Sequence, residues 1–277
     1  MKQVISFSGG RTSAYLLSLF TSNNDAVFIF CDTGAEHPNT YTFIKQCVKH
    51  FNIELVCLKA VVNKERGVGV TYKVVDVDSI GWDLSMFSDI SKKYGAPFNP
   101  SGAHCTQHLK TVPFYKYCDE KFGKGNYTTW LGIRVDELRR LKPKKGVKYL
   151  AELSQMDKNG ILGYWRDMPF DLNLDEWLGN CVFCIKKPVN RVALATLSEP
   201  ELAREFSQML INSDSNEKLK GAIYRGKVTL DGVAKLFDGV NAESIIKTTR
   251  LRRECGTGQG DSCEVFGCQE DMFEDKQ

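Results

Sequence analysis

The sequence lacks long hydrophobic runs and carries little excess charge of either sign. No segment approaches the roughly 20 consecutive apolar residues that a membrane-spanning helix needs, and the net charge is only +3 over 277 residues. The composition gives no global reason to expect membrane or nucleic-acid binding. The N-terminal segment turns polar and glycine-rich at Ser8, before the apolar core of a signal peptide could form. We therefore expect a cytoplasmic protein with one large domain and at most a small appendage.

Cysteine, in contrast, is abundant. The chain has ten cysteines, and a reducing cytoplasm disfavours disulfides. Metal binding or redox chemistry is therefore the better explanation for those cysteines that cluster. Cys31, Cys47 and Cys57 lie within apolar periodic segments, so we expect them to be small buried hydrophobic residues.

Apolar segments of strand and helix character alternate near the N-terminus. They predict strands at 4–7, 26–31 and 55–62, with helices at 14–20 and 39–51 between them. This alternation is typical of an α/β fold, in which helices flank a parallel twisted sheet. Ligands of such sheets bind at the carboxyl ends of the strands.

The remainder of the chain is less regular. We predict another strand at 127–132, an exposed charged loop at 139–148 and a helical C-terminal part from residue 199. The last residues are rich in glycine and acids, which predicts a flexible, cysteine-containing tail at 251–277 after one domain at 1–250.

The turn after the first predicted strand suits an anionic group. It reads Ser8-Gly9-Gly10-Arg11-Thr12-Ser13. The glycines allow backbone N–H groups to turn inward, the hydroxyls add donors, and the following helix contributes its positive end. The turn lacks the Gly-Lys-Ser/Thr ending of a Walker loop, so it is not an ordinary P-loop.

Four short motifs, in the same order along the chain, resemble the phosphoadenylyl-sulfate (PAPS)/adenylyl-sulfate (APS) reductase family. The loop at 6–13 is similar to the S-G-G-K-D-S loop of the wider adenine nucleotide α-hydrolase superfamily, although it has Arg11 and Thr12 for Lys and Asp. The segment 32–41 resembles D-T-G-x-x-x-P-E-T-Y, and 132–137 resembles G-L/I-R-x-x-E. The tail segment 253–258 partly matches E-C-G-L/I-H, with Gly258 in place of the histidine.

The resemblance implies an adenine-nucleotide site and an adenine nucleotide α-hydrolase-like, Rossmann-like fold for 1–250. It assigns nucleotide binding to Ser6, Ser8, Gly9, Gly10, Arg11, Thr12, Ser13, Asp32, Thr33, Gly34, Gly132 and Arg134.

The cysteine pattern resembles the iron–sulfur branch of that family. Cys105 begins a segment similar to C-C-x-x-x-K-x-x-P-L, in which Lys110 is matched and the second cysteine is replaced, and Cys181 and Cys184 form a later C-x-x-C. The resemblance implies a cluster, expected to be [4Fe–4S], on these three cysteines. Cys263 is the fourth candidate ligand, with Cys268, Cys255 or an open iron position as alternatives. The alternative hypothesis is that the same cysteines bind zinc.

The resemblance implies a thiol-dependent reductase that releases sulfite from APS or PAPS. Cys255 would be the nucleophile, Lys110, Arg134 and Arg11 would hold the anionic groups, and a thioredoxin-like dithiol would be the reductant. A homo-oligomer is compatible with this reading.

Two alternatives stay open. The same loop could serve an ATP pyrophosphatase that uses Mg²⁺ and transfers sulfur to nucleic acid or a small molecule. A non-catalytic regulator that binds nucleotide or cluster is the third hypothesis.

Overall fold

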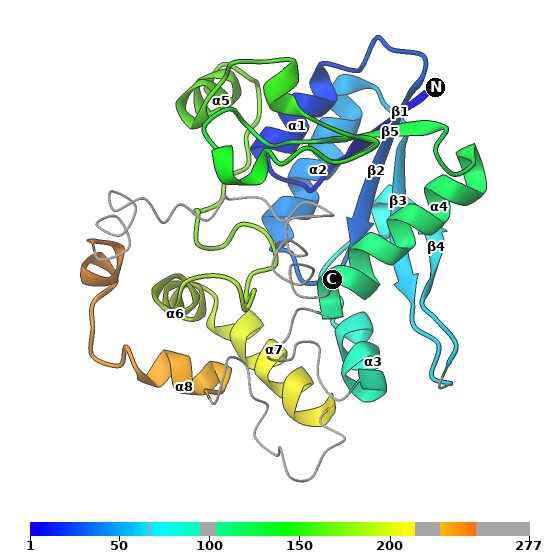
Figure 1. Ribbon diagram of the computed structural model, residues 1–277. Helices are drawn as coiled ribbons and strands as arrows, with labels where there is room; N and C mark the ends of the chain where they lie inside the picture. Colours follow the sequence, from blue (N-terminus) through cyan, green and yellow to red (C-terminus); the bar gives the residue numbers. More distant parts are fainter. Residues whose placement is uncertain (66, 95–103, 214–227, 248–277) are drawn as a thin grey trace.

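The computed structural model describes residues 1–65, 67–94, 104–213 and 228–247. These residues form a six-stranded sheet in the order β4-β3-β2-β1-β5-β6. The strands are β1 (Lys2–Ser6), β2 (Ala26–Asp32), β3 (Leu55–Val61), β4 (Thr71–Val75), β5 (Tyr127–Leu131) and β6 (Val147–Tyr149). All are parallel except β4, which pairs antiparallel with β3 at one edge (Figure 1).

Helices cover both faces of the sheet. α1 (Arg11–Ser18), α2 (Pro38–Phe51) and α5 (Lys158–Arg166) share one apolar core with β1 and β2. α4 (Val112–Phe122) packs on the opposite face, in a separate core that includes Val4 and Ile29. Strand β2 is apolar along almost its whole length because both of its faces are buried.

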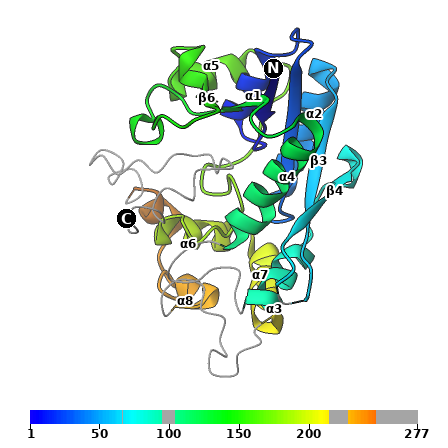
Figure 2. The same ribbon diagram turned by 45° about the vertical axis from the view of Figure 1, so that its right-hand side comes forward.

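A third group of helices lies at the carboxyl ends of the strands, below the sheet in Figure 1 and Figure 2. It consists of α3 (Ser85–Tyr94), α6 (Val189–Ser198), α7 (Pro200–Ser213) and α8 (Leu230–Lys235). These helices pack around Phe87, Phe183 and Phe206. Ala35, just after β2, belongs to the same core, which joins this layer to the sheet.

The predicted α/β fold is confirmed, and the N-terminal strands and helices begin within a few residues of their predicted positions. Two details differ. The antiparallel strand β4 was not predicted, and the charged segment 139–148 ends in strand β6, although most of it is exposed as expected. Both are short edge strands that bury few side chains, so neither leaves a strong apolar pattern.

The predicted tail at 251–277 lies outside the described residues, and so does the predicted boundary between it and the domain at 1–250. Cys255, Cys263 and Cys268 belong to this segment. Within the part of the chain that is described, no helix has the length and apolar character required to cross a membrane.

Candidate nucleotide and cysteine sites

The loops that carry the predicted motifs meet at one edge of the sheet. β1 lies between β2 and β5, and all three run in the same direction, so their carboxyl ends are neighbours. The chain continues from β1 to β2, β3 and β4 on one side and then returns to β5 on the other side of β1, which makes this a switch point where α/β proteins bind ligands. Arg134 Nη1, after β5, donates to Thr12 Oγ1, after β1, at 3.1 Å.

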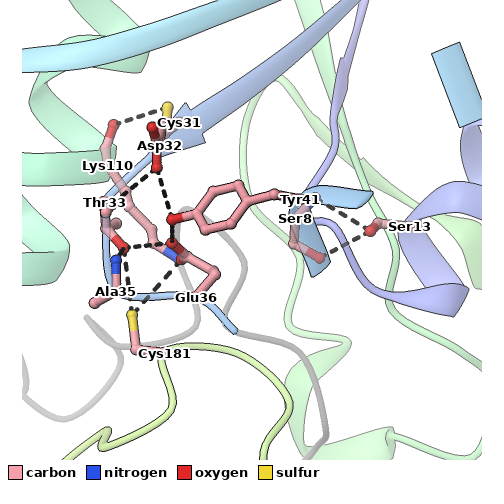
Figure 3. Close-up of polar contacts among 11 residues, drawn as sticks. Ser8, Ser13, Cys31, Asp32, Thr33, Ala35, Glu36, Tyr41, Lys110 and Cys181 are labelled. Carbon is pink, nitrogen blue, oxygen red and sulfur yellow. Dashed lines mark hydrogen bonds and ion pairs between the residues drawn. The ribbon is translucent and has the colours of Figure 1, made fainter. Parts of the chain in front are cut away.

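Hydroxyl hydrogen bonds shape the glycine turn after β1. Ser13 Oγ accepts from the backbone N–H of Ser8 at 3.1 Å and lies 2.8 Å from Ser8 Oγ (Figure 3). Gly10 is the N-cap of α1 and leaves that helix end without a side-chain cap. The turn therefore presents the uncapped start of α1, a favourable position for an anion.

The two glycines of the turn have different roles. Gly9 has φ +80°, and a Cβ there would lie 2.7 Å from Thr40 Cγ2 and 3.0 Å from Ile44 Cδ1 of α2. Gly10 has an ordinary extended backbone, and a Cβ there would meet nothing closer than Ser8 Oγ at 3.7 Å. Gly9 is thus required for packing against α2, whereas the backbone at Gly10 borders open space.

A pocket of about 820 Å³, open to solvent, borders this turn. Its lining combines the glycine turn with residues from four later segments. They are Ser8, Gly9, Gly10, Arg11, Thr12, Thr40, Arg134, Lys158, Ile161, Leu162, Leu172, Leu174, Asp175, Glu176, Gly179 and Asn180.

The two arginines that border the pocket are engaged by carboxylates. Arg11 makes a bidentate pair with Asp171, at 2.6 and 2.9 Å, and also donates to the carbonyl of Leu172. Arg134 makes a bidentate pair with Asp136, at 2.9 and 3.1 Å. The predicted anion-binding arginines thus lie at the pocket as expected, but an anion has to share them with protein carboxylates.

The sequence motifs did not point to the far wall of this pocket. Asp175 and Glu176 line it, and Glu176 pairs with Lys158 of α5. Asn180, the neighbour of Cys181, also lines it and adopts φ +58°. These side chains lie more than 140 residues from the glycine turn, and no short motif links them to it.

Asp32, at the end of β2, is fully buried rather than exposed to the pocket. Its Oδ1 accepts from the backbone N–H of Gly34 at 2.8 Å and from the Tyr41 hydroxyl at 3.0 Å. Lys59 Nζ lies 3.3 Å from Oδ2, close enough for an ion pair, although the angle does not make a hydrogen bond. Burial, reinforced by the neighbouring charge of Glu36, raises the Asp32 pKa to about 6.

Glu36 forms the centre of a buried polar network that the sequence did not reveal (Figure 3). Its side chain is only 1% exposed. Oε2 accepts from Thr33 Oγ1 at 2.7 Å and lies 3.2 Å from the Tyr41 hydroxyl, whose single proton Glu36 and Asp32 share. Oε1 lies 3.3 Å from Lys110 Nζ and 3.6 Å from Cys181 Sγ. The Glu36 carboxylate therefore links the segment after β2 to Lys110 and to the C-x-x-C loop.

The three predicted cluster cysteines meet in a second, smaller pocket of about 380 Å³. Cys105 is the N-cap of a π-helical segment (Thr106–Thr111) that leads into α4, and Cys181 and Cys184 come from the loop before α6. Lys110 and Thr33 line the same pocket, and the rest of its lining is mainly apolar: Phe87, Thr106, Phe183, Ile185 and Phe206. Within the described ranges, no three His, Cys, Asp or Glu side chains are close enough together to hold a single metal ion.

The backbone fixes one side of this cysteine pocket. Glu36 and Cys181 form an isolated antiparallel bridge, and the Val182 N–H donates to the carbonyl of Ala35 at 2.9 Å. Lys187 Nζ, itself buried, donates to the carbonyls of Trp177 and Val182. The C-x-x-C loop is therefore held by the segment after β2 and by a lysine.

Four other cysteines are inert core residues. Cys31, Cys47, Cys57 and Cys118 are buried, which raises the thiol pKa of each, to about 12 for Cys31 and Cys57. A thiol that stays protonated is neither a nucleophile nor a metal ligand. The expectation that Cys31, Cys47 and Cys57 act as small hydrophobic residues is confirmed.

The remaining predicted nucleotide residues are structural neighbours of these sites. Ser6 ends β1 and Gly132 follows β5, and both are buried. Gly34 has φ +73°, and a Cβ there would lie 1.9 Å from the Asp83 carbonyl oxygen, so only glycine fits. Direct nucleotide contact by these three residues remains a prediction.

The sheet order and the glycine turn at its switch point define an α/β protein of the adenine nucleotide α-hydrolase-like, Rossmann-like type. Residues 2–149 match the family described as the phosphoadenosine phosphosulfate reductase domain, and the chain belongs to this family. Members of the family bind adenine nucleotide substrates.

A protein of Escherichia phage lambda, named uncharacterized nin region protein ORF290, is 45% identical to the chain over 284 aligned residues. The alignment covers 98% of both proteins, so the likeness extends through the C-terminal cysteine segments. The name of that relative states no activity.

Proposed function

We propose that this protein is a thiol-dependent reductase that converts APS or PAPS to sulfite. The nucleotide would occupy the pocket beside the Ser8–Ser13 turn, with its sulfate directed toward Lys110. The proposal combines the family's use of adenine nucleotides with a cysteine pocket that adjoins the nucleotide pocket.

One observation carries the proposal. The segment from Gly179 to Cys184 borders both pockets: Gly179 and Asn180 line the nucleotide pocket, and Cys181 and Cys184 line the cysteine pocket. A ligand in the first pocket is therefore one residue away from the lining of the second. Lys110 supplies a buried ammonium at this junction, where a sulfate group carries negative charge.

The reaction would proceed in two displacements. The Cys255 thiolate attacks the sulfate sulfur, and the bond between that sulfur and the bridging oxygen breaks. AMP, or adenosine 3′,5′-bisphosphate from PAPS, leaves, and Cys255 carries an S-sulfonate. A thiolate of a thioredoxin-like dithiol then attacks Cys255 Sγ and displaces sulfite. The second thiol of the partner resolves the mixed disulfide, so the partner is oxidised by two electrons and Cys255 is regenerated.

An iron–sulfur cluster fits the donor set of the second pocket. Cys105, Cys181 and Cys184 would supply three thiolate ligands within mainly apolar walls, and cysteine thiolates are the ligands that hold such clusters. The fourth ligand would come from Cys263, Cys268 or Cys255, or be absent. The bound cluster would supply an electrostatic environment for the sulfate beside Lys110.

A second candidate function is supported by the acidic wall of the nucleotide pocket. Asp175 and Glu176 line it, and Arg11 and Arg134 are already paired with carboxylates. Such a wall suits a nucleotide that arrives with Mg²⁺, because Mg²⁺ bridges one or two carboxylates to phosphate oxygens. An ATP pyrophosphatase that transfers sulfur to nucleic acid or a small molecule would use the pocket in this way.

Mass spectrometry separates the two functions. Protein purified without oxygen is incubated with APS or PAPS in the absence of reductant, and we expect a sulfite-sized adduct on Cys255. Addition of thioredoxin should release sulfite and remove the adduct. The Cys255→Ser variant should bind the nucleotide and form no adduct.

The alternatives make different predictions in the same assay. Cleavage of ATP to AMP and pyrophosphate with Mg²⁺, without an adduct from APS or PAPS, would refute the reductase proposal in favour of sulfur transfer. Nucleotide binding without either reaction would favour the regulator.

A further inference from the structure

We propose that the basic segment 139–148 is a binding surface for the phosphate backbone of a nucleic acid. The segment connects β5 to β6 and includes the first two residues of β6. This role goes beyond the reductase function proposed above and does not depend on it.

Positive charge is concentrated in the basic segment. It has no acidic residue and six basic ones: Arg139, Arg140, Lys142, Lys144, Lys145 and Lys148. The whole chain has a net charge of only +3, so the remainder, without these six cations, is net negative. A polyanion is therefore attracted to this part of the molecule and not to its surface as a whole.

Most of these cations are available to a ligand. Four of them are exposed and, within the described ranges, form no ion pair with a carboxylate: Arg139, Lys142, Lys145 and Lys148. The carboxylates next to the segment in the chain have other partners. Asp136 pairs with Arg134, and Glu152 Oε1 accepts from the Tyr149 backbone N–H at 2.9 Å. The positive charge of the four exposed side chains is therefore not neutralised locally.

The backbone of the basic segment is held by the sheet. The Gly146 carbonyl accepts from the Thr129 N–H of β5 at 2.9 Å, and the Tyr149 hydroxyl donates to the Lys142 carbonyl. β6, which contains Lys148, lies beside β5 at the end of the sheet opposite β4. The cations are thus presented along one edge of the sheet from a fixed backbone, which lowers the entropy lost when a ligand binds.

Glu137 joins the basic segment to the nucleotide pocket. Its Oε1 accepts from Arg140 Nη1 at 2.6 Å, and its Oε2 accepts from the Arg134 backbone N–H at 3.0 Å. Arg134 lines the nucleotide pocket. A nucleic-acid strand bound along the segment would therefore lie beside the rim of that pocket.

The residue types favour a nucleic acid over an acidic protein as the partner. Protein interfaces have an apolar centre and are poor in lysine, whereas lysine and arginine supply most contacts to phosphate backbones. The apolar side chains of the segment, Leu141 and Val147, pack partly into the core beneath α4. Leu138, directly before the segment, is mostly exposed, but one such side chain does not make an apolar centre.

Fluorescence anisotropy of the full chain tests the proposal with a labelled single-stranded RNA and a labelled DNA duplex of equal length and mixed sequence. The triple variant Arg139→Gln/Lys142→Gln/Lys145→Gln removes three exposed cations that form no ion pair with a described carboxylate. We expect its affinity for the nucleic acid that the parent binds better to fall at least about tenfold at low salt. The slope of log K against log salt concentration should become shallower by about 2–3. Its affinity for AMP should equal that of the parent.

The matched control is Lys49→Gln/Lys92→Gln/Lys235→Gln, which removes the same charge from exposed residues of α2, α3 and α8. It should bind both nucleic acids as the parent does. Absence of binding by the parent at low salt, or equal losses in the two triple variants, would overturn the proposal.

Two further outcomes would assign the basic segment to another ligand and overturn the proposal as well. Polyglutamate that binds the parent as tightly as either nucleic acid would indicate an acidic protein partner. Loss of AMP affinity in the Arg139/Lys142/Lys145 variant, with nucleic-acid binding unchanged, would show that the segment attracts the small nucleotide instead. None of these measurements involves sulfite release, so failure of the reductase proposal leaves the test intact.

Discussion

The stability of the protein should respond in opposite ways to alanine at the two glycines of the Ser8–Ser13 turn. At Gly9, φ +80° costs an alanine about 1–2 kcal/mol. Its methyl group would also lie 2.7 Å from Thr40 Cγ2 and 3.0 Å from Ile44 Cδ1, well inside normal carbon contact, and such overpacking costs roughly 1–3 kcal/mol. We therefore expect Gly9→Ala to lower the free energy of unfolding by about 2–5 kcal/mol.

Gly10→Ala is the matched variant one residue away. Its backbone, φ −97° and ψ 160°, accepts any residue, and no atom crowds the added methyl group. A gain of about 0.4–1 kcal/mol is expected from reduced entropy of the unfolded chain. Because Gly10 borders the pocket, the same methyl group should nevertheless weaken AMP binding.

Urea denaturation followed by tryptophan fluorescence measures both stabilities, and calorimetry measures both AMP affinities. Equal stabilities of Gly9→Ala and Gly10→Ala would refute the argument from backbone angle and packing. A bulky side chain at position 9 would clash with α2, so a loss of binding there would not report on the ligand. Substitution of Gly10 is therefore the better test of nucleotide binding at this turn.

Three further outcomes are expected. The pKa of Asp32 is raised from 3.8 to about 6, so the stability that its protonated form contributes is present below pH 4 and is lost as the pH rises through 6. Over this pH range the unfolding free energy of Asp32→Asn should rise relative to that of the parent by up to roughly 3 kcal/mol. Parallel pH profiles of the two proteins would contradict this. Asp171→Asn removes the carboxylate that pairs with the Arg11 guanidinium and should tighten AMP binding about two- to fivefold. Weaker AMP binding in calorimetry would show instead that the Arg11–Asp171 ion pair organises the site. Protein made without oxygen should be brown and contain iron and sulfide. The Cys181→Ser variant should lose the colour, whereas the control Cys47→Ser, changed in the buried core, should keep it. One zinc ion per chain without iron would rule out the cluster.

Much of the fold could be predicted because it is encoded locally. The apolar run at 26–31 and the helical spacing of Phe43, Ile44 and Cys47 each report burial within a few residues of chain. The antiparallel strand β4 escaped prediction because its burial depends on a neighbouring strand and not on its own pattern. The predicted start of the first helix was also displaced. The apolar pattern begins at Ala14, whereas α1 begins at Arg11, directly after the glycine turn.

Half of the nucleotide pocket could also be predicted. Parallel strands bring the segments after β1 and β5 together, so the glycine turn and Arg134 were expected at one edge. The opposite wall, with Asp175 and Glu176, reaches that edge only through the packing of a distant segment. The carboxylates that engage both arginines are invisible to a motif, because a motif records which residue is present and not what it contacts.

The sequence by itself determined the alternation of strands and helices, the chemistry of the glycine turn and the pairing of Cys181 with Cys184, since each depends on residues close together in the chain. Only the tertiary structure decided that Glu36 is buried between Lys110 and Cys181, and that the Thr40 hydroxyl has no hydrogen-bond partner among the described residues. The physical reason is that burial and hydrogen bonding are properties of the whole surrounding of a side chain. That surrounding is assembled from segments far apart in sequence, and no spacing within a single segment contains it.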